Sequence, residues 1–266
     1  MSIDEPGTQA FRQQVVEAYR RIHDSAHYRR DDLRGYTNVG YFEDSETDQG
    51  RASERLAMRM MARLGVQAGR VLDAGCGVGG LARHLGEQFG PGQVHSINIS
   101  PHQLALARDH APGVEFHLMP AERLSFAEAS FDAVVSLEAM SHFHGRADFL
   151  REAFRVLKPG GRIAATDVVF RAEPRSKSPL FGRQELYETL EDYVAVWQDA
   201  GFRDVRCEDT TGPCWGGHVA NNRKRAVRER MTGVIDAAGF DAAMRDAARL
   251  ATMSLFYVFV DATKPG

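Results

Sequence analysis

Apolar positions along the chain change their spacing as the sequence proceeds. Over about residues 10–30 they recur every three or four positions, at Phe11, Val15, Tyr19 and Ile22, and residues 51–64 resume the same spacing. This periodicity predicts two amphipathic helices, because one face of a helix repeats every 3.6 residues. A polar, aromatic loop, RGYTNVGYFEDSETDQG, separates them. We therefore expect residues 1–50 to form an N-terminal helical cap, and residues 51–266 to form the main domain.

From residue 70 onward, short apolar runs alternate with helix-like segments. The runs that predict strands are 70–75, 93–100, 114–119, 131–139 and 161–170, and the segments that predict helices are about 79–89, 101–110 and 147–157. This alternation is typical of right-handed βαβ units around a parallel sheet. The helix over 147–157 is expected to end before LKPGG, because Pro159 cannot continue a helix and two glycines supply a turn.

The pattern changes after residue 170. An amphipathic helix is expected over about 183–200, and strands are expected over 202–211 and 254–264. We expect these last two strands to pair antiparallel at one edge of the sheet. The stretch between them is helix-like and too long for a hairpin loop. We expect this insert, about 213–251, to form a helical lid over the mouth of the active site.

Composition narrows the function classes. The chain has 266 residues, 43% hydrophobic and 26% charged, with a formal net charge of −3. This charge argues against a nucleic-acid-binding protein, which is usually basic overall or on one face. The first residues, MSIDEPGTQAFRQQ, are polar and acidic, and we see no membrane span and no disulfide framework among the three cysteines. We expect a cytoplasmic protein.

The segment RVLDAGCGVGGLARHLG (residues 70–86) predicts a strand, a glycine-rich turn and a helix, the usual frame of a nucleotide-like ligand. Gly75, Gly77 and Gly80 have the G-x-G-x-x-G spacing of dinucleotide sites. However, Asp73 stands two residues before Gly75, where dinucleotide sites ordinarily have an apolar residue or glycine. The acid argues against a nicotinamide cofactor.

Four ordered blocks, VLDAGCGVGG, INISPHQLALAR, LSFAEASFDAVVSLEAMSHF and REAFRVLKPGGRIAATDV, closely resemble the class I S-adenosylmethionine-dependent methyltransferases. Within that class the chain looks most like small-molecule methyltransferases acting on natural products, sugars or isoprenoids. The resemblance implies an α/β, Rossmann-like, seven-stranded and mostly parallel sheet with helices on both faces. It also implies S-adenosylmethionine as the cofactor.

The resemblance further implies where the cofactor binds. Asp73 is expected to serve its ammonium group, and the glycine turn to approach its amino-acid portion and ribose. Asn98 ends the second strand where the family usually has Asp or Glu for the ribose hydroxyls, so it lacks the charge-assisted hydrogen bond. The full set expected to bind the cofactor is Tyr41, Asp73, Gly75, Cys76, Gly77, Gly79, Asn98, Ile99, Gln103, Ala121, Glu122, Leu137 and His142.

The chemistry is expected at the carboxyl edge of the fourth and fifth strands, where open α/β sheets bind ligands. His142 is the expected general base, because an imidazole is suited to deprotonating a hydroxyl. Asp167 is expected to orient His142 or to bind the substrate hydroxyl. Glu138 is the alternative proton acceptor. His142 and His144 with these two acids would make a mixed nitrogen and oxygen metal site, but the acids are sparse and we expect no metal.

The substrate is expected to be a small molecule, in contact with Tyr36, Phe143, Trp215 and His218. Three functions stay open: methylation of a hydroxyl oxygen, which we favour; methylation of carbon in an isoprenoid or alkene; and a cyclase that binds S-adenosylmethionine without transferring its methyl group. The basic stretch RKRAVRER is short and fits a solvated helix face, so no nucleic-acid partner is expected. Whether the chain forms a homodimer stays open.

Overall fold

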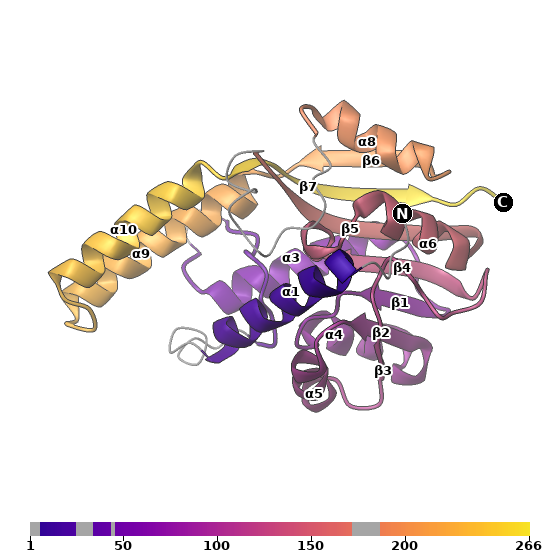
Figure 1. Ribbon diagram of the computed structural model, residues 1–266, viewed down its shortest axis with the longest axis horizontal. Coiled ribbons are helices and arrows are strands. Elements are labelled where there is room, and N and C mark those ends of the chain that lie inside the picture. The colour runs from indigo at the N-terminus through magenta and orange to yellow at the C-terminus, as the bar shows by residue number, and fades with distance from the viewer. Residues whose placement is uncertain (1–5, 25–33, 44–45, 172–186) are drawn as a thin grey trace.

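The computed structural model describes residues 6–24, 34–43, 46–171 and 187–266. These residues form a seven-stranded sheet with the order β3-β2-β1-β4-β5-β7-β6 (Figure 1). Strands β1 to β5 run parallel, and β7 is antiparallel to both β5 and β6. The strands are β1 (Val71–Ala74), β2 (Val94–Asn98), β3 (Glu115–Leu118), β4 (Phe131–Leu137), β5 (Leu157–Phe170), β6 (Arg203–Asp209) and β7 (Ser254–Thr263). The predicted mostly parallel sheet with an antiparallel edge pair is confirmed.

Helices connect and cover the strands. The described helices are α1 (Pro6–Asp24), α3 (Gln49–Leu64), α4 (Gly80–Phe89), α5 (Pro101–His110), α6 (Arg146–Val156), α8 (Leu190–Asp199), α9 (Gly217–Met231) and α10 (Ala237–Ala251), with short helical turns η1 (Pro91–Gln93), η2 (Met140–His142) and η3 (Gly212–Gly216). Helix α1 begins earlier than expected, and its expected end near residue 30 lies outside the described residues. The same holds for residues 183–186 of the helix expected over 183–200.

The helices build a hydrophobic core on each face of the sheet. On one face, α3 and α4 bury Leu56, Met60 and Leu81 against the strands. On the other face, α6 and α8 bury Phe149 and Trp197. Neighbouring residues of the central strands divide between the two cores, as strand alternation requires: Val71 and Val135 belong to the first, Leu72 and Val134 to the second.

The α6–β5 junction differs slightly from the expectation. The helix ends at Val156, and β5 begins at Leu157, which pairs with Phe131 before the register shifts. Gly160 then adopts φ +75°, the left-handed conformation that glycine tolerates best. The KPGG sequence therefore makes an irregular start of the strand instead of a turn that precedes it.

Helices α9 and α10 form the predicted helical insert, but they do not cover the sheet. They pack side by side as a hairpin that projects from the body on the side opposite the C-terminus (Figure 1). At its base, buried Trp215 donates from Nε1 to the Leu250 carbonyl at 2.8 Å and packs against Phe170. No helix within the described ranges is both long and apolar enough to cross a membrane.

Candidate functional site

A cavity opens at the carboxyl edge of the parallel strands. It encloses about 700 Å³, including the part open to solvent. The ends of β2 and β4, the loops after β1 to β4 and the start of α5 contribute Gly75, Gly77, Ile97, Asn98, Ile99, Ser100, Gln103, Met119, Ala121, Glu122, Leu137, Glu138, Ala139, His142 and Phe143. The remaining lining residues are Arg12, Val15, Val16 and Tyr19 of α1, and Thr37.

The glycine turn after β1 forms one wall of this cavity. Gly75 has φ +83° and Gly77 has φ +54°, so both occupy the left-handed region. A Cβ atom on Gly75 would lie 2.4 Å from the Cβ of Ala139. Any residue other than glycine would clash there. A Cβ on Gly77 would meet only Thr37 Oγ1, at 3.5 Å. The turn thus presents bare backbone to the cavity.

Asp73 lies beneath this turn and is 1% exposed. Its Oδ2 accepts a hydrogen bond from Ser96 Oγ at 3.3 Å, while its Oδ1 has no hydrogen-bond partner among the residues the structure describes. Burial raises the pKa of Asp73 to about 7. A buried carboxylate without a cation is unfavourable. Asp73 therefore suits a cationic ligand group.

Asn98 links the glycine turn to α5. Its Nδ2 donates to Gln103 Oε1 at 3.0 Å and to the Gly77 carbonyl at 3.4 Å, and its Oδ1 accepts from the Ser100 amide at 2.9 Å. Ser100 in turn caps α5 by accepting from the Gln103 amide. This neutral network fixes the end of β2 beside the cavity.

Glu122 connects three parts of the cavity wall. It is 4% exposed. Its Oε1 accepts from the backbone amide of His144, after β4, and its Oε2 accepts from Arg12 Nη2 of α1 at 3.4 Å. Because both carboxylate oxygens are bonded, Glu122 holds α1 against the loops that follow β3 and β4.

Glu138 follows β4 with φ +53°, an uncommon conformation for a residue with a side chain. Its backbone amide donates to Thr166 Oγ1 at 3.0 Å. Its carboxylate accepts from the Tyr257 hydroxyl at 2.7 Å and from the Val39 amide at 3.1 and 3.2 Å. Burial raises the pKa of Glu138 to about 7. A carboxyl group that titrates near neutrality can exchange a proton with a ligand.

His142 lies four residues after Glu138, at the end of η2, and lines the same cavity. The ring of Tyr19 from α1 meets its ring edge to face, with centroids 5.4 Å apart. Thr8 and Phe11 of α1 contact the neighbouring His144. Helix α1 therefore covers the cavity where the histidine segment forms its wall.

Asp167 lies inside the core. It has no exposed surface, and it accepts from Arg146 Nε at 2.6 Å, from Arg146 Nη2 at 3.2 Å and from the Tyr193 hydroxyl at 2.9 Å. These hydrogen bonds tie it to α6 and α8 and do not join it to His142, and its expected role beside His142 or at a substrate hydroxyl stays a prediction.

Residues 72–165 match the family model described as methyltransferase domain. The 27-O-demethylrifamycin SV methyltransferase of Amycolatopsis mediterranei is 33% identical over 244 residues, which cover 85% of this chain and 89% of that protein. The chain belongs to the methyltransferase family. Methyltransferase GfsG of Streptomyces halstedii is 41% identical over 143 residues, half of this chain and 51% of that protein.

Solved methyltransferases share the fold. The geranyl diphosphate C-methyltransferase of Streptomyces coelicolor A3(2), in complex with Mg²⁺, geranyl diphosphate and S-adenosyl-L-homocysteine, superposes with a TM-score of 0.70 at 17% identity, over 99% of this chain and all of that one. Family and fold together make S-adenosylmethionine the cofactor of this methyltransferase, as expected from its sequence.

The methyltransferase cavity gathers most of the expected cofactor residues. Those that line it are Gly75, Gly77, Asn98, Ile99, Gln103, Ala121, Glu122, Leu137 and His142. Asp73 and Cys76 line a smaller hollow on the other side of the glycine turn. Gly79 lines neither; a Cβ there would lie 2.9 Å from Ala107 Cα, so this glycine serves the packing of α4 on α5. Tyr41 also lines neither, and stacks with Arg59 at 4.1 Å.

The expected substrate residues are scattered. Phe143 lines the main cavity, and Tyr36 lines the smaller hollow, buried and stacked on His84. Trp215 and His218 line neither space; they lie at the base of the α9–α10 hairpin, where His218 contacts Asn222 at 3.0 Å. Neither expected residue of the insert therefore borders the cavity in this structure, and closure of the active-site mouth by the insert stays a prediction.

Sequence reasoning expected an N-terminal helical cap, but it did not identify the α1 residues that line the cavity. The stripe of Val15 and Tyr19 predicts a packed helix, but it does not say what the helix packs on. Arg12 lies next to this stripe and reaches Glu122, a contact between residues 110 positions apart. Tyr257 was also missed as the partner of Glu138; its only signal is a hydroxyl within the apolar run SLFYVFV.

Proposed function

We propose that this methyltransferase transfers the methyl group of S-adenosylmethionine to a hydroxyl oxygen of a small natural-product-type molecule. One observation carries the proposal: Glu138 and His142, two titratable side chains, line the same cavity as the glycine turn. A methyl acceptor that enters beside the cofactor would thus meet groups able to take its proton.

The fit of the cofactor rests on Asp73 and the glycine turn. The free Oδ1 of Asp73 suits the ammonium group, and the bare backbone at Gly75 and Gly77 leaves room for the amino-acid portion and ribose. Asn98 offers an amide in place of the usual acid for the ribose hydroxyls. Glu122 and Ala121 would lie at the adenine. When bound, S-adenosylmethionine supplies a methyl group on a positively charged sulfur.

In the proposed reaction, the acceptor oxygen forms a bond to the methyl carbon while the carbon–sulfur bond breaks and its electron pair stays on sulfur. His142 takes the hydroxyl proton during this attack. Glu138 holds the Val39 segment and Tyr257 against the cavity, which positions the acceptor and excludes water. The O-methylating relative from Amycolatopsis mediterranei supports oxygen as the acceptor atom.

Carbon methylation is the second candidate. Tyr19 and Phe143 add aromatic surface to the cavity, and aromatic rings stabilise a cationic intermediate. In this version Glu138 would take the proton from carbon. The fold shared with geranyl diphosphate C-methyltransferase is compatible with it. The cyclase alternative requires only that the cofactor binds.

The test uses S-adenosylmethionine with a deuterated methyl group. The full chain is incubated with hydroxylated polyketides and, separately, with prenyl diphosphates, and the products are examined by mass spectrometry and NMR. We expect the label on oxygen of a hydroxylated acceptor. Label on carbon would overturn the oxygen assignment in favour of the second candidate. Tight cofactor binding with no transfer to either panel would overturn both and favour the cyclase.

A further inference from the structure

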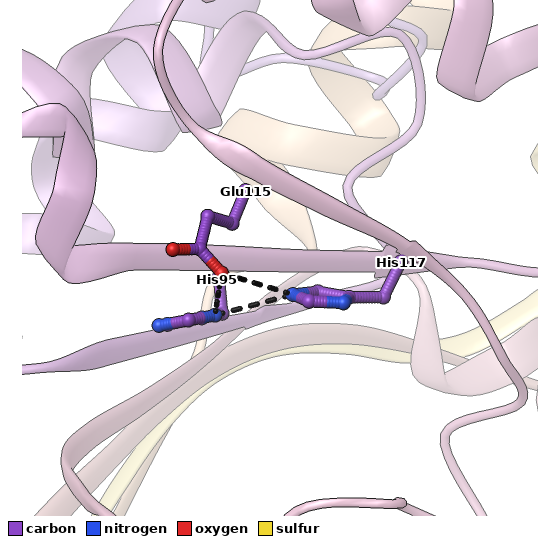
Figure 2. Close-up of side chains that lie close together, drawn as sticks. All are labelled: His95, Glu115 and His117. Carbon is purple, nitrogen blue, oxygen red and sulfur yellow. Dashed lines mark hydrogen bonds and ion pairs between the residues drawn. The ribbon is translucent and has the colours of Figure 1, made fainter.

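Three potential metal ligands, none of which lines the cavity, converge on one face of the sheet (Figure 2). His95 is the second residue of β2, and Glu115 and His117 are the first and third residues of β3. The strand register pairs His95 with Glu115 and Ile97 with His117. Because side chains alternate along a strand, all three project to the same side.

The distances between their ligand atoms are those of a small coordination site. His95 Nδ1 lies 3.1 Å from Glu115 Oε2 and 3.1 Å from His117 Nε2, and His117 Nε2 lies 3.8 Å from Glu115 Oε2. Ligands of a tetrahedral zinc ion with bonds of about 2.0–2.1 Å lie about 3.3 Å apart. A metal ion therefore fits between these atoms after only small side-chain movements.

We propose that His95, Glu115 and His117 bind one divalent transition-metal ion of the zinc type, with water as a fourth ligand. Two imidazoles and one carboxylate favour zinc and its neighbours over magnesium or calcium, which prefer all-oxygen sites. The side chain of Glu115 is 53% exposed and that of His117 is 30% exposed, so an ion and its water can reach the site from solvent.

The two imidazoles are prepared for this role. Phe126 and Phe131 pack edge to face against the His95 ring, and Phe126 packs in the same way against His117. These rings limit the rotamers of the histidines and hold their nitrogens together.

Arg70 sets the affinity of the site. Its Nε donates to His95 Nε2 at 2.8 Å, so in the metal-free chain Nε2 is an acceptor and the ring proton resides on Nδ1. Binding a metal at Nδ1 transfers this proton to Nε2, and Arg70 must then swing away. We therefore expect a moderate rather than a very tight site, which Arg70 weakens.

None of the three proposed ligands lines the cavity. The nearest cavity-lining residue on β2 is Ile97, two residues beyond His95 and the register partner of His117. In the part of the chain that the structure describes, β3 is the outer strand at its end of the sheet and pairs only with β2. A metal ion here would clip this edge strand to its neighbour and so stabilise the fold.

The test titrates chelator-treated full-length chain with Zn²⁺ by calorimetry, and with Co²⁺ by visible absorption. We expect one ion per chain and the intense absorption of tetrahedral Co²⁺. Glu115→Gln and His117→Gln should each weaken Zn²⁺ binding at least about tenfold. The matched control is His84→Gln, whose ring nitrogens lie 3.1 Å from Glu54 and Glu87 but belong to no three-ligand group among the described residues. It should leave binding unchanged.

Arg70→Met adds a test with the opposite sign. It removes the donor to His95 and should tighten Zn²⁺ binding by about threefold or more, the worth of one hydrogen bond. All variants should keep wild-type affinity for S-adenosylmethionine, which verifies that they fold. No saturable Zn²⁺ binding by the wild type would overturn the proposal. Equal binding by the wild type and the Glu115→Gln/His117→Gln double variant would overturn it too.

Discussion

The buried pair of Asp167 and Arg146 allows the sharpest separation of a structural acid from a catalytic one. The side chain of Asp167 is 0% exposed and that of Arg146 is 5% exposed. Asp167→Asn keeps the shape but removes the charge that Arg146 Nε and Nη2 contact, so the buried guanidinium loses this counter-ion. Removing one partner of a buried pair costs roughly 3–5 kcal/mol. That is a large part of the about 5–15 kcal/mol that holds a typical domain folded.

The free energy of unfolding is measured by urea denaturation of the ligand-free chain. Replacing both partners by apolar residues of similar size, Arg146→Met with Asp167→Leu, should restore much of the loss, because no unpaired charge remains. The affinity for S-adenosylmethionine, measured by calorimetry at a temperature where Asp167→Asn is folded, should stay within about twofold.

The opposite pattern would refute this reasoning. If Asp167→Asn unfolds at the same urea concentration as the wild type and yet loses methyl transfer about a hundredfold, Asp167 acts in the chemistry. The interpretation of the Arg146 contact as structural would then be wrong, whatever the geometry of the pair.

Three further predictions concern the cavity. Burial raises the pKa of Asp73 from 3.8 to about 7. The ionised carboxylate therefore does not destabilise the fold below pH 3.8 and destabilises it fully above about pH 7. Asp73→Asn should thus raise the free energy of unfolding near pH 8 by at most roughly 4 kcal/mol and leave it unchanged near pH 4. The same variant should bind S-adenosylmethionine more weakly. An unchanged affinity would remove Asp73 from the cofactor site. Glu138→Gln should likewise raise the free energy of unfolding in urea near pH 8, by at most roughly 3 kcal/mol, because burial raises the pKa of Glu138 from 4.5 to about 7. Identical denaturation curves of wild type and variant at both pH 5 and pH 8 would contradict this prediction. His142→Gln should lower turnover by about 10²–10⁴ with cofactor affinity within several-fold, whereas His144→Gln should not; a loss of only a few-fold excludes His142 as the base.

The sequence predicts the frame of the molecule well, because the signals that define it are local. Alternating apolar runs predict each strand to within a few residues. The turn after β1 is predicted because its residues adopt positive φ values, which glycine favours and other residue types do not. Asp73 could be placed beside that turn for the same reason: it is two residues away along the chain.

Long-range partners could not be predicted. Asp167 and Arg146 are 21 positions apart, and the helix that carries Arg146 gives no sign that this residue turns inward. The same limit applies to α1, whose apolar stripe is equally compatible with any apolar surface. His95 and His117 each show a polar side chain in a strand, but only the register of β2 on β3 brings them together.

Acids at the strand ends can be sorted by what balances their charge. Asp73, Glu138 and Asp167 all lie where the parallel strands approach the ligand edge. Their positions in the sequence alone do not distinguish a structural acid from one that serves the site. Asp167 has Arg146, so its charge is already compensated within the protein. Among the described residues, Asp73 and Glu138 are bonded only to neutral donors, and burial raises the pKa of each to about 7. A fold keeps such uncompensated acids where binding or catalysis needs them. Asp73 and Glu138, which destabilise the ligand-free chain, are therefore the acids that we propose for the site of methyl transfer, in preference to Asp167.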